Sequence, residues 1–171
     1  MKRPLVVGVM GGGQVDEAVR TMAYRLGALI AESGWVLLNG GRSAGVMDAS
    51  AQGAADNGGL TVGILPDETT VQASKHIRIP ICTGMGSARN SINVLSSDVV
   101  VACPGSAGTV SEIALALKHG KVVITIGYNA SGLFDLGKYE HQLVEAATER
   151  EAVDIIRRLY PGNDNTPIPP F

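Results

Sequence analysis

The sequence predicts an α/β fold in which a doubly wound, mostly parallel sheet carries helices on both faces. Short runs of apolar residues alternate along the chain with longer segments of helical periodicity. Most of these runs are apolar at consecutive positions, as expected for strands covered on both sides by helices. The chain also holds 22 glycines in 171 residues, nearly twice the average share of roughly 7%, and many follow the predicted strands.

Each predicted strand is a short, largely apolar run. These runs cover residues 5–10, 35–38, 60–65, 76–81, 98–103 and 122–126. The fourth run differs because polar and apolar residues alternate over 76–79, and this alternation predicts a strand at the edge of the sheet.

The predicted helices occupy residues 15–33, 46–57, 87–97 and 110–118, where apolar residues recur at helical spacing. Gly34, Gly58 and Gly120 follow three of them and predict C-terminal caps. A last helix over 149–160 starts at a capping box that pairs Thr148 with Glu151. We expect a single domain over residues 1–171, with 161–171 as an extended tail.

Composition excludes several classes of function. The chain has 16 acidic and 14 basic residues, and its longest basic clusters are pairs, which argues against a nucleic-acid partner. No apolar stretch approaches the ~18 residues of a membrane span, and the apolar start lacks a signal-peptide cleavage site, so we predict a cytoplasmic protein. Cys82 and Cys103 lie in apolar runs without metal-ligand spacing. They predict buried, reduced thiols and no metal site formed by the protein.

Three glycine-rich segments follow predicted strands, at residues 11–13, 39–45 and 104–109. The carboxyl ends of parallel strands meet at one edge of a sheet, where ligands bind in open α/β folds. Glycine permits close approach of the backbone, and the free N–H groups at a helix start favour an anion. Tight turns alone would explain any one of these loops, but their coincidence predicts a phosphate site.

The common fingerprints for phosphate compounds do not match. Asp16 stands where the third glycine of GxGxxG belongs, and the sequence contains no P-loop. Residues 41–45 read as GxSxG around Ser43, but the chain is short for an α/β-hydrolase and its histidines show no supporting pattern. We therefore interpret Ser43 as a hydrogen-bond donor to an anion or as a helix cap.

Three charged residues are candidates for the site. Glu112 either completes a capping box that begins at Thr109 or directs a carboxylate into the crevice, as a general acid/base or as an acceptor for a base or ribose. Arg89 opens a predicted helix and is suited to two-point binding of a phosphate. Arg42 is a second candidate for the same role, although either arginine is also compatible with a solvated surface position.

The same residues resemble a known superfamily. The matching segments are residues 40–49 (GGRSAGVMDA), 53–54 (GA), 61–66 (TVGILP), 89–90 (RN) and 104–112 (PGSAGTVSE). They are similar to the Lonely guy, or lysine decarboxylase-like, proteins and to their relatives the molybdenum cofactor carrier proteins. The last segment resembles the PGGxGTxxE motif of the superfamily. The resemblance implies a Rossmann-like homodimer or homotetramer.

The two branches of this superfamily differ in function. Lonely guy enzymes hydrolyse nucleoside 5′-monophosphates at the N-glycosidic bond with an arginine and the motif glutamate, which correspond to Arg89 and Glu112. Carrier proteins bind the molybdenum cofactor, a phosphorylated pterin dithiolene, without a reaction. Asn90 replaces the lysine of the enzymes and Ser106 replaces a motif glycine. The pair at 89–90 (RN), together with the sequence SEIALALK at 111–118, is more similar to the carrier branch.

We therefore expect a carrier or storage protein that binds the molybdenum cofactor, has no catalytic residues and passes the cofactor to a molybdoenzyme. The alternative is a phosphoribohydrolase that uses Arg89 and Glu112. The expected binding residues are Gly11, Gly12, Gly13, Gly40, Gly41, Arg42, Ser43, Gly45, Met47, Arg89, Asn90, Pro104, Gly105, Ser106, Ala107, Gly108, Thr109 and Glu112.

Overall fold

A computed structural model describes residues 3–130, 132–135 and 137–163. Its centre is a seven-stranded sheet with the order β4-β3-β2-β1-β5-β6-β7, in which every pair of neighbouring strands is parallel. The strands are β1 (Val6–Met10), β2 (Val36–Asn39), β3 (Thr61–Leu65), β4 (Ile79–Cys82), β5 (Val99–Ala102), β6 (Val123–Ile126) and β7 (Leu143–Ala146).

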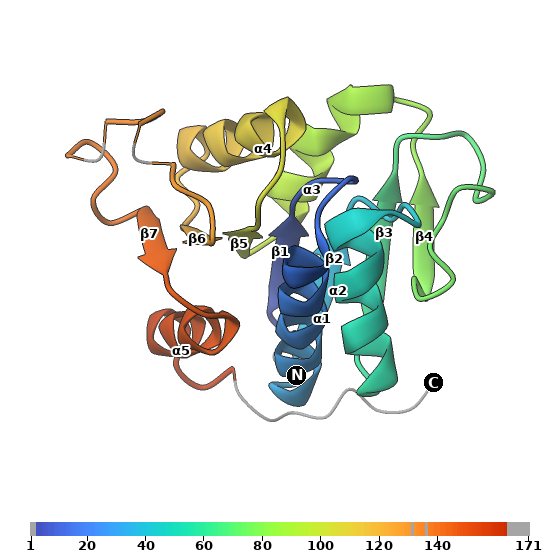
Figure 1. The fold of residues 1–171 in the computed structure, drawn as a ribbon, viewed down its shortest axis with the longest axis horizontal. Helices are drawn as coiled ribbons and strands as arrows, with labels where there is room; N and C mark the ends of the chain where they lie inside the picture. Colours follow the sequence, from blue (N-terminus) through green and yellow to red (C-terminus); the bar gives the residue numbers. More distant parts are fainter. Residues whose placement is uncertain (1–2, 131, 136, 164–171) are drawn as a thin grey trace.

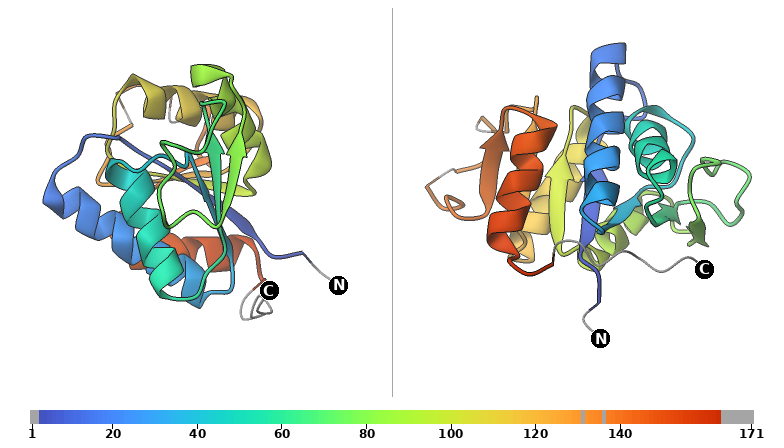
Figure 2. Two further views of the ribbon diagram at one scale, coloured as in Figure 1. Left: turned by 90° about the vertical axis from the view of Figure 1, so that its right-hand side faces the viewer. Right: turned by 90° about the horizontal axis from the view of Figure 1, so that it is seen from below.

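Helices cover both faces of the sheet, which confirms the predicted Rossmann-like, doubly wound α/β architecture. They are α1 (Glu17–Glu32), α2 (Gly45–Asp56), the 3-10 helix η1 (Gly86–Arg89), α3 (Asn90–Ser96), α4 (Ala107–Lys118) and α5 (Glu149–Leu159). Figure 1 shows α1, α2 and α5 on one side of the sheet, with α3 and α4 on the other. The two views of Figure 2 show the same layers.

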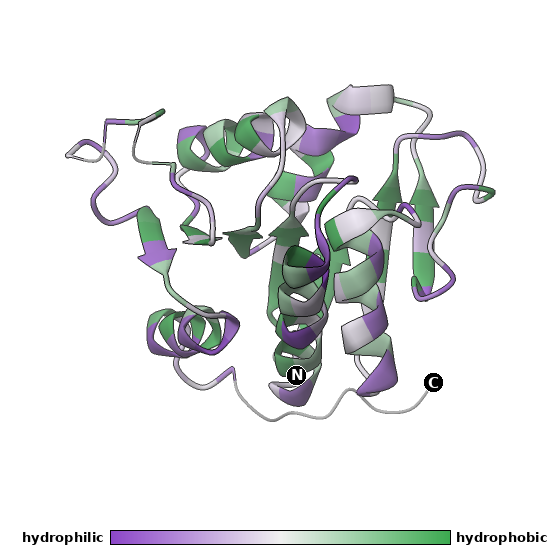
Figure 3. Ribbon diagram, viewed as in Figure 1, coloured by the Kyte–Doolittle hydropathy of each residue, from purple (hydrophilic) through white to green (hydrophobic). Residues whose placement is uncertain are grey.

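The apolar strands supply both halves of the core, as their colouring in Figure 3 shows. One cluster packs α1, α2 and α5 against the sheet and includes Trp35, which is fully buried. Its indole Nε1 donates a hydrogen bond to the Asn163 carbonyl oxygen over 2.9 Å. The second cluster packs α3 and α4 against the opposite face. The continuously apolar strands are thus covered by helices on both faces, as their sequences predicted.

Helices α1 and α2 cross at two glycines. A Cβ atom added to Gly27 would lie 2.0 Å from the Ser50 carbonyl oxygen, and one added to Gly53 would lie 1.9 Å from the Tyr24 carbonyl oxygen. Backbone therefore meets backbone at this crossing, and the missing side chains allow the two helices to approach closely.

The helix boundaries follow local signals. Asp16 caps α1 by accepting a hydrogen bond from the Val19 N–H over 2.8 Å. Thr148 caps α5 through the Glu151 N–H at 3.2 Å, while Glu151 Oε2 accepts from the Ala147 N–H at 2.7 Å. The predicted capping box is confirmed, with the reciprocal bond one residue earlier than usual. The three glycines expected after helices have φ angles of 70 to 73°, which suits such C-terminal positions.

The structure differs from the sequence predictions at both edges of the sheet. Strand β4 starts at Ile79 rather than at residue 76, and its four residues are all exposed, so the alternating residues 76–78 precede the strand. The edge position itself is confirmed. Strand β7 forms the opposite edge and was not predicted, because its sequence LVEA is short and contains a glutamate. Residues 164–171 of the predicted tail lie outside the described residues.

The two cysteines differ from each other. Cys103 is fully buried, and burial raises the pKa of its thiol to about 12. Cys82 is exposed on β4, so its predicted burial is wrong; both thiols are free. Within the described residues, no helix has the length and apolar character of a membrane span.

Candidate functional site

The three predicted glycine-rich loops meet above the carboxyl end of β1, the strand at which the sheet changes its direction of winding. The Gly12 N–H donates to the Pro104 carbonyl oxygen over 2.9 Å, and the Gly12 carbonyl oxygen accepts from the Val46 N–H over 3.0 Å. One residue thus joins the loop after β1 to the loops after β2 and β5. Gly45 permits this contact, because its φ is 50° and an added Cβ would lie 2.2 Å from the Gly12 oxygen.

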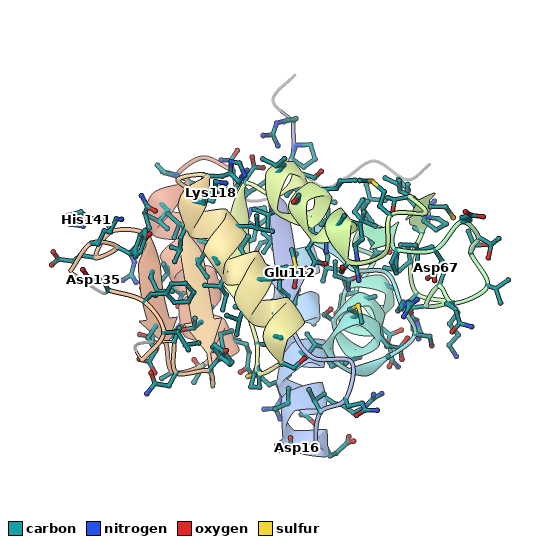
Figure 4. All side chains as sticks on the ribbon, turned by 90° about the horizontal axis from the view of Figure 1, so that it is seen from above. Asp16, Asp67, Glu112, Lys118, Asp135 and His141 are labelled. Carbon is teal, nitrogen blue, oxygen red and sulfur yellow. The ribbon has the colours of Figure 1, made fainter. Side chains whose placement is uncertain are left out.

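A cavity of about 390 Å³ opens where these loops meet. Its lining residues come from all three loops, from the end of β1, from the start of α2, from the residue after β3, from the segment 86–90 and from the first two turns of α4. They are Val9, Met10, Gly11, Gly12, Gly13, Gly40, Arg42, Met47, Pro66, Gly86, Ser87, Arg89, Asn90, Ser106, Gly108, Thr109 and Glu112. Seen from above (Figure 4), Glu112 lies on α4 near the middle of the molecule, and Asp67 lies toward the side of β3 and β4.

Most of the predicted binding residues line this cavity, and six do not. Gly41, Ser43, Gly45 and Ala107 belong to the same loops without lining it, and Pro104 and Gly105 line a neighbouring hollow of about 540 Å³. The two cavities share Gly12, Gly13 and Ser106. Ser43 is exposed, and its N–H donates to the Gln72 carbonyl oxygen over 3.1 Å. The GxSxG sequence therefore forms a surface turn.

The structure decides between the two interpretations of Glu112. Helix α4 begins at Ala107 after the cap residue Ser106, so Glu112 stands in the second turn and does not cap the helix. Its side chain lines the cavity, although the residue is only 7% exposed. Oε1 accepts a hydrogen bond from Asn93 Nδ2 over 2.8 Å. Burial raises the pKa of the Glu112 carboxyl, and the Asn93 bond and the Arg89 charge lower it in part.

Arg89 provides a partly buried cation at the cavity. Its Nη1 donates to the Ile64 carbonyl oxygen over 3.0 Å, which fixes the guanidinium against the end of β3. Nε is buried and has no hydrogen-bond partner among the described residues. Burial lowers the pKa of Arg89, and the nearby carboxyl of Glu112 raises it. Because a guanidinium remains charged in proteins, Arg89 presents an unpaired N–H donor and a positive charge.

Arg42 also lines the cavity, but a carboxylate already holds it. Its Nη2 lies 2.6 Å from Asp67 Oδ1 and its Nε lies 3.1 Å from Oδ2. These bonds raise the pKa of Arg42 and lower the pKa of Asp67. Of the two arginines, Arg89 therefore has the greater capacity to bind a new anion.

Sequence reasoning missed several residues of the site. Gly86 and Ser87 line the cavity and stand just before Arg89, so the glycine-rich run at 84–90 contained a usable signal. Asn93 follows Arg89 by about one helical turn, a spacing that places both residues on one side of a helix. Asp67 gave no signal, because its contact with Arg42 depends on how the loop after β3 folds back.

The donor set suits an anion rather than a bare metal ion. Glycine N–H groups, the start of α4, two guanidinium groups and the hydroxyl groups of Ser106 and Thr109 surround the cavity. Within the described residues, no group of three or more His, Cys, Asp or Glu side chains is placed to hold a metal. The cavity is thus equipped for a phosphorylated ligand that also meets one buried carboxyl group.

Comparison with known proteins agrees with this geometry. The model of the SLOG cluster4 family matches residues 4–158. The molybdenum cofactor binding protein of Rippkaea orientalis is 45% identical, superposes with a TM-score of 0.88 and is matched over 99% of its chain and 93% of this one. The molybdenum cofactor carrier protein of Chlamydomonas reinhardtii is 41% identical, with a TM-score of 0.85 over 92% of this chain and 98% of its own.

An enzyme is also among the similar proteins. The cytokinin riboside 5′-monophosphate phosphoribohydrolase of Mycobacterium tuberculosis is 34% identical over 94 residues, which are 54% of this chain and 50% of the enzyme. The likeness to the two cofactor-binding proteins thus extends over much more of the chain.

Proposed function

This chain belongs to the SLOG cluster4 family, and from that premise we propose that it binds the molybdenum cofactor as a carrier or storage protein without chemical turnover. The cofactor is a phosphorylated pterin dithiolene that brings its own molybdenum ligands. The observation that carries the proposal is the cavity in which three glycine-rich loops, the start of α4 and the Arg89 guanidinium converge. Similarity to two cofactor-binding proteins over nearly the whole chain supports it.

The residues present fit such a ligand. Arg89 Nε is a buried donor that lacks a partner among the described residues, and an anion oxygen would satisfy it. Gly40 keeps this side of the cavity open, because an added Cβ would lie 2.2 Å from Arg89 Nη1 and 2.6 Å from Met47 Sδ. We assign the terminal phosphate to the glycine loops and Arg89, with Ser106, Thr109 and Asn90 as further polar contacts.

The remaining predicted residues have supporting roles in this proposal. Gly41, Gly45 and Ala107 shape the loops, Pro104 and Gly105 border the neighbouring hollow, and Ser43 lies outside the cavity. We also propose that the protein assembles as a homodimer or homotetramer and passes the cofactor to a molybdoenzyme.

Titration with intact molybdenum cofactor tests the proposal. We expect saturable binding of one cofactor per subunit, protection of the cofactor from oxidation, and weak competition by AMP. Arg89→Ala should weaken binding by roughly 1.5 to 3 kcal/mol, the scale of a lost charge-assisted contact. Arg158→Ala, which removes an exposed arginine from α5 on the other face of the sheet, is the control. Unchanged affinity of Arg89→Ala would remove Arg89 from the site.

The second candidate function is hydrolysis of nucleoside 5′-monophosphates, with Arg89 and Glu112 as the reactive pair. The observation that favours it is that the buried Glu112 carboxyl and the Arg89 guanidinium line one cavity, and burial raises the pKa of that carboxyl, the direction in which a general acid is tuned. Release of free base from AMP by the purified protein, abolished by Glu112→Gln, would establish this function. Absence of base release together with tight cofactor binding would exclude it.

A further inference from the structure

We propose that Glu112, held in place by Asn93, recognises the edge of the ligand's pterin ring that presents two adjacent N–H donors, the ring N3–H and the 2-amino group. This inference rests on the proposed function, because it names the group that the cavity selects beside the phosphate. Glu112 is then a specificity-determining residue, and Asn93 is the residue that positions it.

The first argument is the polarity of the cavity. Among its described lining residues Glu112 is the one acidic side chain, whereas Arg42 and Arg89 are cationic. A phosphate oxygen and a carboxylate oxygen are both acceptors and both negative, so the phosphate does not bind at Glu112. The carboxylate instead requires donors from the ligand. A ring edge with two N–H groups side by side supplies them in the spacing of the two carboxylate oxygens.

The second argument is the way the carboxyl is held. Asn93 is fully buried on α3, and its Nδ2 donates to Glu112 Oε1 across the contact between α3 and α4. A second bond joins the same helices, from Asn90 Nδ2 to Ser111 Oγ over 3.1 Å. A carboxylate has about four lone-pair positions, and Asn93 occupies one of them. Glu112 therefore has a fixed orientation and free acceptor capacity on the side of the cavity.

The third argument is an unsatisfied acceptor beside this pair. Asn93 Oδ1 is buried and has no hydrogen-bond partner among the described residues. Arg89 lies near enough to influence the charge of Glu112, but its Nη1 donates to the Ile64 carbonyl oxygen, and its buried Nε is bonded to neither acceptor among the described residues. Acceptor capacity therefore remains at Glu112 and Asn93, and an unsatisfied buried acceptor is costly.

This arrangement discriminates between ring systems. The pterin edge carries the same donor pair as guanine, with a ring N–H beside an amino group. Hypoxanthine keeps the ring N–H and lacks the amino group, and adenine places its amino group beside a ring nitrogen that accepts. A carboxylate accepts hydrogen bonds from both donors of the pterin or guanine edge. It repels the ring nitrogen of adenine, which is itself an acceptor. Glu112 therefore favours a pterin over the adenine of AMP in the same cavity.

GMP, IMP and AMP carry the same ribose 5′-phosphate and differ only in the base, so differences in their affinity report recognition of the base edge. Equilibrium binding of GMP, IMP and AMP is measured beside that of the intact molybdenum cofactor. We expect the wild-type protein to prefer GMP over AMP by about tenfold to a hundredfold, the range of a two-point contact with a base edge, with IMP between them. Glu112→Gln should weaken binding of the cofactor and of GMP by a similar factor and strengthen binding of AMP, because the amide can donate to the ring nitrogen of adenine that the carboxylate opposes.

Two further variants secure the interpretation. Glu112→Asp keeps the negative charge but shortens the side chain by one methylene, which moves the carboxylate away from the ligand. We therefore expect this variant to lose the preference for GMP as well. Glu68→Gln removes an exposed carboxyl outside the cavity lining and should leave every affinity unchanged. Thermal melting of each variant identifies a loss of folding.

The outcomes separate this inference from the proposed function. If the wild-type protein binds the cofactor and Glu112→Gln binds it equally well, the role of Glu112 is wrong and the carrier function stands. If the wild-type protein does not bind the cofactor, the carrier function fails, and the comparison of GMP with AMP still decides what Glu112 recognises. Equal binding of the two nucleotides by the wild-type protein overturns the inference.

Discussion

At the scale of single residues, Glu112 carries a carboxyl group that is buried away from solvent. Burial is the largest influence on it and raises its pKa above the ordinary value of 4.5, against the smaller opposing effects of Asn93 and Arg89. The folded state therefore binds the Glu112 proton more tightly than the unfolded state does. The stability that this proton contributes is fully present below 4.5 and is lost as the pH rises through the folded-state pKa.

Glu112→Gln should consequently be more stable than the wild-type protein at neutral pH, because the amide stays neutral and keeps an oxygen for Asn93. The difference should narrow as the pH falls toward 4.5, where the wild-type carboxyl becomes protonated in both states. Urea unfolding across this range measures it, with Glu68→Gln as a control for loss of an exposed carboxyl. A difference that does not vary with pH would show that ionisation of Glu112 carries no cost.

At the scale of elements, the crossing of α1 and α2 depends on Gly27 and Gly53. Either glycine replaced by alanine would bring a Cβ within about 2 Å of a backbone carbonyl oxygen, so the helices must separate. We expect each variant to lose about 1 to 3 kcal/mol of unfolding free energy, the usual cost of overpacking. Gly108→Ala is the matched control, because nothing lies within 4 Å of its added Cβ and alanine favours a helix. Urea unfolding distinguishes the two cases, and equal effects would contradict the close crossing.

The elements also show what the sequence can predict. Continuous apolar runs identify β1, β2, β3, β5 and β6, because burial on both faces leaves few polar residues in them. The edge strands give a weaker signal: β7 is only partly buried and its sequence LVEA is mixed, and β4 is exposed although its sequence IPIC is apolar. The glycine loops and Arg89 are predictable because parallel strands deliver them to one edge. The contact between Asn93 and Glu112 is not, since it joins two helices whose packing no local pattern describes.

At the scale of the whole molecule, β4 leaves one edge of the sheet open. Ile79 and Ile81 are each 42% exposed there, and Met85 and Leu95 are 50% and 55% exposed. Exposed apolar side chains on a strand with one open edge are a site of association between chains, in keeping with the proposed homodimer or homotetramer. Replacement of Ile79 and Ile81 by lysine should therefore give a smaller assembly in light scattering. Val71→Lys, at an 81% exposed position outside β4, should not change the size, and an unchanged size of the double variant would place the interface elsewhere.

The backbone of Gly12, whose N–H bonds to Pro104 and whose carbonyl oxygen bonds to Val46, sets an order of events during synthesis of the protein. The chain between Gly12 and Pro104 contains β2, β3, β4 and β5. Most of the sheet is therefore synthesised before Pro104, the later of the two partners of Gly12, leaves the ribosome. A nascent chain that ends before residue 104 presents an incomplete binding edge. A ligand that contacts all three loops can therefore bind only after these strands have formed.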